Sequence, residues 1–184
     1  NTLIEAIYPN KDAEGLDAYN LGRIFLWVSF LIPCTPAAVL AHIKSTGIDL
    51  KGKEAVVLGR SEIIGKPIAM LLLKENVTVT ICHSGTKDLP GHVQRADIVV
   101  AAVGKPLFVK GDWIKPGAIV IDVGINQVDG KIVGDVDFNA GKEKAGYIAS
   151  KLSWGNLTGK KKKPEKNSDV SLREELKKLF VQSD

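Results

Sequence analysis

The stretch that decides the fold is VVLGRSEIIGKPIA, residues 56–69. A short apolar run enters Gly59, and a second glycine, Gly65, precedes a further apolar run. This order predicts a strand, a tight turn and a helix. A helix that begins at a glycine turn directs free backbone N–H groups, and the positive end of its dipole, toward a bound phosphate. The stretch therefore raises the question of which phosphate compound the turn holds.

The chain repeats this alternation of strand and helix on both sides of the turn. Apolar runs rich in Val and Ile predict strands over 54–58, 77–82, 97–103 and 118–122. Helical segments are expected over 67–74, 89–95 and 109–114, and a hairpin over 127–133 around Asp129-Gly130. Apolar strands that alternate with helices are typical of a parallel sheet covered on both faces. The predicted fold is therefore α/β, a Rossmann-like, doubly wound and mostly parallel sheet.

A further helix is predicted upstream of the first strand. Thr35 is expected to cap it, with Pro36 at the first helical position, where the missing N–H has no helical partner to lose. Gly47 is expected to end the helix in a left-handed turn.

The composition is that of an ordinary soluble globular domain, since 45% of the 184 residues are hydrophobic and 25% are charged. The longest apolar run, 24–32, is far shorter than the roughly 20 residues of a membrane-spanning helix. Two cysteines, Cys34 and Cys82, cannot form a disulfide framework and are expected to pack rather than react. The three histidines are well separated, so no metal site is predicted. The expected compartment is the cytoplasm, with an organelle left open because the sequence begins at Asn1 and not at methionine.

The net charge of +4 lies wholly in residues 151–184, because residues 1–150 hold as many acidic as basic residues. This balance argues against nucleic acid as a partner of the main body. Four consecutive lysines, 160–163, open a charged segment that contains a proline and is expected to be disordered. The spacing of Ser171 and Glu174 predicts a capping box for a short amphipathic helix. A solvated tail is favoured over a docking helix, and a role in binding nucleic acid or membrane is the weakest alternative.

The first candidate for the phosphate is a nucleoside triphosphate held by a P-loop. That motif needs G-x-x-x-x-G-K-[ST], in which the hydroxyl binds the magnesium ion. Here Gly59 and Gly65 are one residue too far apart, and Pro67 stands where the hydroxyl is required. The sequence therefore disfavours this class.

The second candidate is a dinucleotide. The motif G-x-G-x-x-G is matched at Gly59, but Ser61 replaces the second glycine and Gly65 comes one residue late. The end of the second strand selects the cofactor, since NAD enzymes place Asp or Glu there for the ribose 2′-hydroxyl. This chain has CHSGT at 82–86, with Ser84 and no carboxylate, and Arg60 lies in the turn, where a guanidinium can bind a phosphate. The residues favour NADP, against the alternative that Arg60 and Ser84 are ordinary surface residues.

Five stretches resemble the bifunctional methylenetetrahydrofolate dehydrogenase/methenyltetrahydrofolate cyclohydrolase family. They are PCTPAAV at 33–39, VVLGRSEIIGKPIAMLL at 56–72, VTVTICHSGT at 77–86, the segments ADIVVAAVGKP and WIKPGAIVIDVGIN within 96–126, and GDVDF at 134–138. The resemblance implies an enzyme of one-carbon metabolism, usually a homodimer, that oxidises 5,10-methylenetetrahydrofolate by hydride transfer to NADP. The same enzyme then hydrolyses the methenyl product to 10-formyltetrahydrofolate.

The resemblance also implies which residues meet the cofactor. Gly59, Arg60 and Ser61 are expected to contact NADP, with Ser84 joining Arg60 near the 2′-phosphate. Gly104 and Ile125 are expected against the nicotinamide half. His83 is expected beside the adenosine end, as an ordinary polar residue and not a general acid or base.

Parts of the family pattern are missing. The family's catalytic lysine comes from an N-terminal domain, and none of the lysines here stands in its motif. A catalytic Asp belongs to a KDVDG segment, and here Glu14, in KDAEG, occupies that position, with a surface carboxylate as the alternative reading. After Ile148 the sequence departs from the family's folate loop. The predicted domains are a remnant of the folate domain and linker over 1–32, an NADP-binding domain over 33–150 and a basic tail over 151–184. A truncated, non-catalytic module for dinucleotide binding or dimerisation is the alternative function.

Overall fold

The computed structural model describes residue 4 and residues 6–29 and 31–150. It contains a five-stranded sheet in the order β2-β1-β3-β4-β7, in which every neighbouring pair is parallel. The strands are β1 (Glu54–Leu58), β2 (Thr78–Cys82), β3 (Ile98–Ala101), β4 (Ile119–Asp122) and β7 (Tyr147–Ser150). The helices are α2 (Ala18–Phe25), α3 (Cys34–Ser45), α4 (Gly65–Lys74), α5 (Leu89–Arg95) and α6 (Phe138–Lys144), with 3₁₀ turns η1 (Pro9–Lys11) and η2 (Gly111–Trp113). The predicted α/β class and parallel sheet are confirmed.

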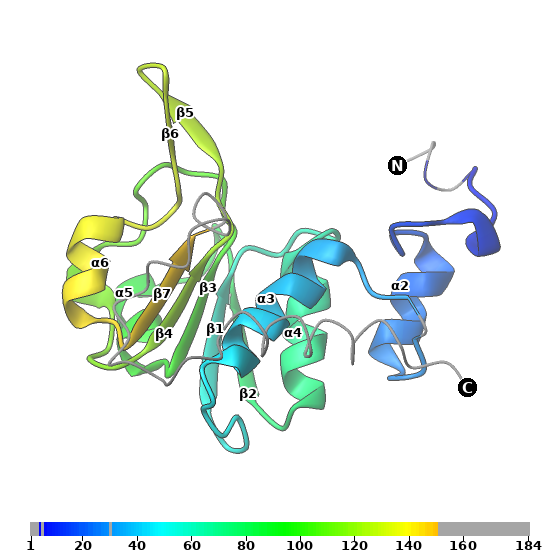
Figure 1. The fold of residues 1–184 in the computed structure, drawn as a ribbon, viewed down its shortest axis with the longest axis horizontal. Helices are drawn as coiled ribbons and strands as arrows, with labels where there is room; N and C mark the ends of the chain where they lie inside the picture. The colour runs from blue at the N-terminus through cyan, green and yellow to red at the C-terminus, as the bar shows by residue number, and fades with distance from the viewer. Residues whose placement is uncertain (1–3, 5, 30, 151–184) are drawn as a thin grey trace.

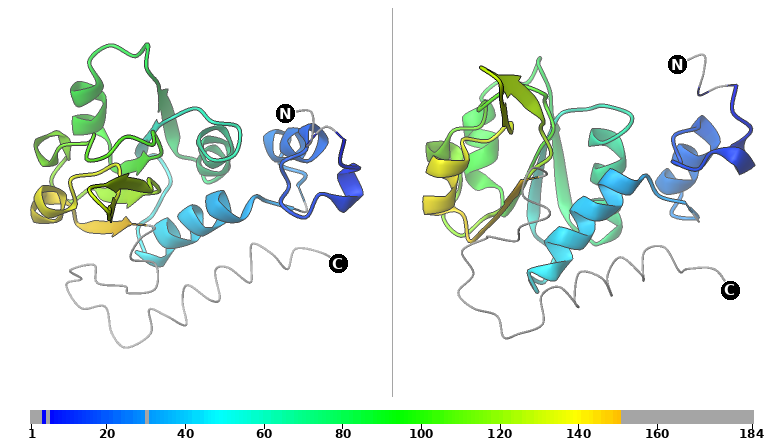
Figure 2. Two further views of the ribbon diagram at one scale, coloured as in Figure 1. Left: turned by 90° about the horizontal axis from the view of Figure 1, so that it is seen from above. Right: turned by 45° about the horizontal axis from the view of Figure 1, so that its top comes forward.

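Helices cover both faces of this sheet, as Figure 1 shows, and alternate strand residues face two separate cores. Val57, Val100 and Ile121 belong to the core under α3 and α4. Val56 and Val99, on the opposite face, belong to the core under α5, η2 and α6. The two further views in Figure 2 show α3 and α4 on one side and α6 on the other. Because both faces are buried, the central strands are almost continuously apolar, except for Glu54 at the exposed start of β1 and Asp122 at the end of β4.

Strand order places the reversal of direction between β1 and β3. The chain leaves β1 through α4 to reach β2 on one side, then returns through α5 to β3 on the other side of β1. In doubly wound sheets the crevice beyond the carboxyl ends of two such strands is where ligands bind.

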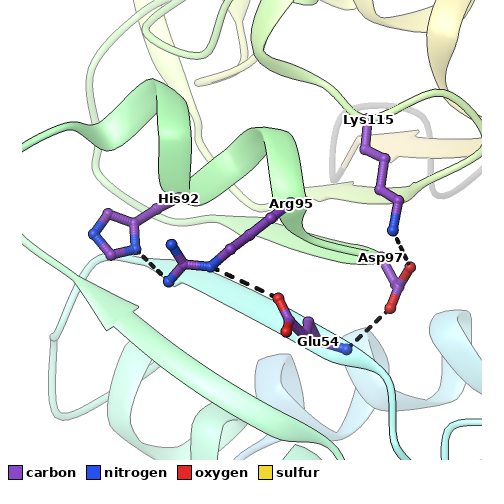
Figure 3. A network of polar contacts seen from close by, with 5 residues as sticks. All are labelled: Glu54, His92, Arg95, Asp97 and Lys115. Carbon is purple, nitrogen blue, oxygen red and sulfur yellow. Dashed lines mark hydrogen bonds and ion pairs between the residues drawn. The ribbon is translucent and has the colours of Figure 1, made fainter.

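A polar network ties the opposite, amino ends of β1 and β3 together (Figure 3). The Asp97 carboxylate accepts the backbone N–H of Glu54 at 3.0 Å and pairs with Lys115 Nζ at 2.8 Å. Arg95 lies 3.7 Å from the Glu54 carboxylate and donates to His92 Nδ1 at 2.7 Å. The network holds β1 and β3 in register at their amino ends, which lie farthest from the crevice.

The predicted hairpin is confirmed as β5 (Asn126–Val128) and β6 (Lys131–Val133), which pair antiparallel. Asp129 and Gly130 both have positive φ, at 48° and 74°, as a two-residue hairpin turn requires. The hairpin projects beyond the carboxyl edge of the sheet (Figure 1).

Some local predictions were wrong or absent. Helix α3 begins at Cys34 with Pro33 as its N-cap, so Thr35 is not the cap and Pro36 is not the first helical residue. Pro33, buried and with φ −51°, makes the entry without a side-chain cap. Gly47 has the expected left-handed φ, 75°. The sequence interpretation did not include α2, α6 or β7, and its predictions for 151–184 lie outside the described residues.

Helix α2 lies against α4, away from the sheet. Across the residues that the structure describes, no helix is long and apolar enough to cross a membrane.

Candidate functional site

A cleft of about 300 Å³ lies at the carboxyl ends of β1, β2 and β3. This is the place where the direction of the strand connections reverses, between β1 and β3, and where the topology predicts a binding crevice. The residues that line it come from the ends of β1 and β2, from the segments that follow β1, β2 and β3, and from the start of α5. They are Leu58, Gly59, Arg60, Ser61, Cys82, His83, Ser84, Leu89, Ala102, Val103, Lys105 and Phe108. The cleft thus brings together Gly59, Arg60, Ser61 and Ser84.

The glycine turn is fixed by close backbone packing. Gly59 has φ 114°, and a Cβ there would overlap the carbonyl of Ala102, the residue after β3. A Cβ on Gly65, the first residue of α4, would overlap the carbonyl of Gly59. Both positions therefore require glycine, and together they bring the start of α4 against the turn. The distance between the two glycines, which fits neither sequence motif, is set by this packing.

Ser61 organises the start of α4. Its Oγ accepts the backbone N–H groups of Ile64 and Gly65, both at 3.2 Å, while its carbonyl accepts the N–H of Lys66 at 2.9 Å. The Ser61 hydroxyl, whose oxygen accepts these two bonds, can still donate its own proton. Arg60, next to it, is exposed and lines the cleft. The turn therefore offers a hydroxyl and a guanidinium, two groups that bind phosphate.

The segment after β2 is a closed turn that presents Ser84 at its tip. The N–H of His83 donates to Thr86 Oγ1, and the N–H of Thr86 returns to the carbonyl of His83, both at 2.9 Å. Gly85 donates its N–H to His83 Nδ1 at 3.1 Å, so this histidine nitrogen is occupied within the turn. Ser84 itself is exposed.

Cys82, at the end of β2, is 1% exposed, and burial raises the pKa of its thiol. This confirms the expectation that Cys82 packs. Cys34 is exposed, and its Sγ lies 3.7 Å from Glu14 Oε2.

The loop after β3 is held by a buried carboxylate that sequence reasoning missed. Asp135 is fully buried, and its two oxygens accept the consecutive N–H groups of Val103, Gly104 and Lys105 at 2.6, 2.9 and 2.9 Å. Within this loop Gly104 has φ 64°. The signal was present in the GDVDF stretch at 134–138, where two acidic residues interrupt an apolar context.

Gly104 is exposed and lies between two lining residues, at the margin of the cleft. Ile125 is 55% exposed and immediately precedes β5, and it does not line the cleft. The structure places these two residues after β3 and β4 respectively, so they sit on neighbouring strand ends.

Glu14 is exposed and belongs to the segment before α2, outside the cleft lining. The neighbouring Asp12 orders that segment. Its carboxylate accepts the N–H groups of Gly15 and Asp17 at 2.9 and 2.7 Å and the side-chain amide of Asn20 at 2.9 Å. Burial alone would raise the pKa of Asp12, but these hydrogen bonds outweigh it and hold the pKa below its usual value.

A second cavity, of about 470 Å³, lies between α2 and α4 and is mainly apolar, with Glu62 and Lys66 among its lining residues. In the described part of the chain no three His, Cys, Asp or Glu side chains gather as metal ligands would.

The chain is similar in sequence to known proteins. Residues 33–158 match the family described as tetrahydrofolate dehydrogenase/cyclohydrolase, NAD(P)-binding domain. The bifunctional protein FolD 2 of Geobacter sulfurreducens is 54% identical over 147 residues, covering 79% of this chain and 52% of its own length. FolD of Bacillus licheniformis matches at the same identity and coverage. The chain thus spans about half the length of the curated relatives it matches.

Solved structures are similar to the chain in fold. The bifunctional FolD enzyme of Campylobacter jejuni superposes with a TM-score of 0.79 at 37% identity, covering 97% of this chain and 61% of that one. The FolD structure of Trypanosoma brucei, described as a complex with NADP and an inhibitor, gives 0.76 at 36% identity, covering 97% of this chain and 60% of that one. With the family match extending over most of the chain, this protein belongs to the tetrahydrofolate dehydrogenase/cyclohydrolase family through its NAD(P)-binding domain.

Proposed function

We propose that the cleft binds NADP, and that the chain is the NADP-binding part of a methylenetetrahydrofolate dehydrogenase/methenyltetrahydrofolate cyclohydrolase. One observation carries the proposal: Arg60 and Ser84, from adjacent strand ends, line one cleft together with Lys105. Among the described residues that line it, none is Asp or Glu. A carboxylate at the end of β2 would repel a 2′-phosphate, whereas a guanidinium and a hydroxyl attract it.

Each part of the cleft has a proposed role. The Ser61 hydroxyl receives the pyrophosphate at the positive end of the α4 dipole, and Gly59 and Gly65 let backbone and ligand approach closely. Arg60 and Ser84 bind the 2′-phosphate, and His83 packs beside the adenosine end. Gly104 and Ile125 border the nicotinamide half.

Bound NADP supplies the hydride acceptor for oxidation of 5,10-methylenetetrahydrofolate, and hydrolysis of the methenyl product gives 10-formyltetrahydrofolate. In the whole family enzyme this chemistry also needs the folate-binding half. We therefore include a folate substrate, a homodimer and a cytoplasmic setting in the proposal for the enzyme to which this domain belongs. The boundaries 1–32, 33–150 and 151–184 are part of the same proposal.

The test is calorimetric titration of the chain with NADPH and, in parallel, NADH. We expect tighter binding of NADPH, and loss of that preference in Arg60→Ala. The matched control is Arg95→Ala, the same substitution at the opposite edge of the sheet, where Arg95 contacts Glu54. Equal affinity of the unaltered chain for both dinucleotides, or a preference for NADH, would contradict the assignment of NADP.

The second candidate is a module that binds the dinucleotide without turnover. Glu14, which stands where the family pattern has Asp, favours it: a side chain longer by one methylene displaces the carboxylate, and catalytic placement is sensitive to shifts of about 1 Å. A turnover assay with methylenetetrahydrofolate and NADP distinguishes the two. Measurable turnover by the chain would reject the non-catalytic module.

A further inference from the structure

Asp135 receives four hydrogen bonds from two separate loops. Three come from the consecutive N–H groups of Val103, Gly104 and Lys105, after β3. The fourth comes from the side-chain amide of Asn126 at 2.9 Å, the first residue of β5 and the neighbour of Ile125. One carboxylate thus joins the segments that follow β3 and β4.

Three successive backbone N–H groups that converge on one point form an anion-binding nest. In this loop the nest is filled from inside the protein, since Asp135 is fully buried and does not line the cleft. The N–H groups of 103–105 are therefore committed to the carboxylate and do not serve a phosphate of the ligand.

A second buried carboxylate binds the backbone beside the first. Asp122, at the end of β4, accepts the N–H groups of Gly124, Asp135 and Val136 at 3.0, 2.9 and 3.1 Å. A Cβ on Gly134 would overlap the Asp122 carboxylate, and one on Gly124 would overlap that of Asp135. The backbone that carries Asp135 is therefore held in place on both sides.

We propose that Asp135 is a positioning residue for the nicotinamide half of the dinucleotide. By holding Gly104 and the Ile125-Asn126 segment in fixed relation, it sets the spacing of the two loops between which the nicotinamide end lies. The adenosine half, at Gly59, Arg60 and Ser84, does not depend on it. This inference rests on the proposed function and adds to it a division of the cleft into two independently organised halves.

The experiment compares two ligands on one variant. Asp135→Asn replaces an acceptor oxygen by an NH₂ group that faces backbone donors, and the free chain should show exchange of the 103–105 amide hydrogens about tenfold faster. Binding of NADPH should weaken about tenfold, the factor that corresponds to about 1.4 kcal/mol. Binding of 2′,5′-ADP, which carries the 2′-phosphate but no nicotinamide, should change less than about twofold.

The matched control is Asp137→Asn, two residues along. Asp137 caps α6 through the N–H of Ala140 at 3.2 Å, and Asn caps a helix equally well, so both affinities should stay unchanged. Asn126→Ala, which removes a single donor, should give the same selective loss at a smaller amplitude, and it replaces Asp135→Asn if that variant does not fold. Equal weakening of both ligands, or no weakening of NADPH despite faster exchange, would overturn the positioning role. Failure of the unaltered chain to bind either ligand would instead overturn the proposed function and this inference with it.

Discussion

The turn after β1 and the end of β3 meet backbone to backbone, because the carbonyl of Ala102 occupies the space that a Cβ on Gly59 would need. Gly59 also lies at φ 114° and donates its N–H to the carbonyl of Cys82 at 2.9 Å. One residue therefore joins the ends of β1, β2 and β3, the three strands whose ends form the cleft. Packing therefore requires glycine at position 59, apart from the role in phosphate binding that we propose for this turn.

Gly59→Ala should therefore destabilise the fold as well as the site. The expected loss in the free energy of unfolding is about 3 kcal/mol, which is the sum of backbone strain at positive φ and overlap with Ala102. Urea denaturation measures it. The control is Gly47→Ala, also at positive φ but with nothing within 4 Å of the new Cβ, for which about 1 kcal/mol is expected. Equal losses at the two positions would show that packing against Ala102 is not responsible.

Sequence reasoning succeeded where burial imposes a single pattern. Strands β1, β3 and β4 contribute apolar residues to both cores, and the glycines at 59 and 65 interrupt the pattern at a turn whose packing requires them. It missed β7 because that strand is only four residues long, and its first and last residues, Tyr147 and Ser150, leave just two apolar residues between them. The helix start at Cys34 was misplaced because Thr35-Pro36 is a good local signal that the buried Pro33 pre-empts.

The candidate site likewise contains residues whose positions the sequence predicts and one residue whose position it does not. Arg60, Ser61 and Ser84 follow strands that the sequence marks, and parallel strand ends meet at one edge, so their proximity could be predicted. Asp135 could not be placed in this way. It reaches the loop after β3 from more than thirty residues further along the chain, through backbone N–H groups that have no side-chain signature.

Ser61→Ala tests whether the hydroxyl holds the start of α4. Loss of the acceptor for Ile64 and Gly65 leaves two backbone donors without that partner, and a decrease of about 1 kcal/mol in unfolding free energy is expected. Ser61→Thr retains the oxygen and should recover most of it. If thermal unfolding of the alanine variant matches that of the unaltered chain, water replaces the hydroxyl without loss.

Asp97→Ala tests the polar network at the amino ends of β1 and β3 (Figure 3). The hydrogen bond from Lys115 holds the pKa of Asp97 below its usual value, with a further contribution from the N–H of Glu54. A lowered carboxyl pKa stabilises the fold above the unfolded value of about 3.9 and loses that contribution as the pH falls through the folded pKa.

At pH 7 the alanine variant should lose about 1 kcal/mol, and the difference from the unaltered chain should narrow below about pH 4. Lys66→Met, which breaks the more exposed pair with Glu62, serves as the control and should change stability by less than about 0.5 kcal/mol. A difference that persists unchanged into acid would mean that Asp97 acts through packing and not through its charge.

His42 should make the stability of the domain depend on pH in the mildly acidic range. It lies on α3, 3% exposed, with Nδ1 3.3 Å from the hydroxyl of Tyr147 on β7. Burial lowers the pKa of His42 from its usual 6.5. The unfolded chain therefore binds a proton at a higher pH than the folded one, so the fold loses stability as the pH falls below about 6.5, by at most about 1.4 kcal/mol per pH unit for one proton. His42→Gln, which keeps a polar group near Tyr147, should flatten this dependence between pH 7 and pH 5. Urea midpoints measured across that range check this, and a slope that survives His42→Gln would assign the dependence to another group. The outcome bears on the last strand of the sheet, because His42 on α3 contacts Tyr147 on β7, the strand that pairs with β4.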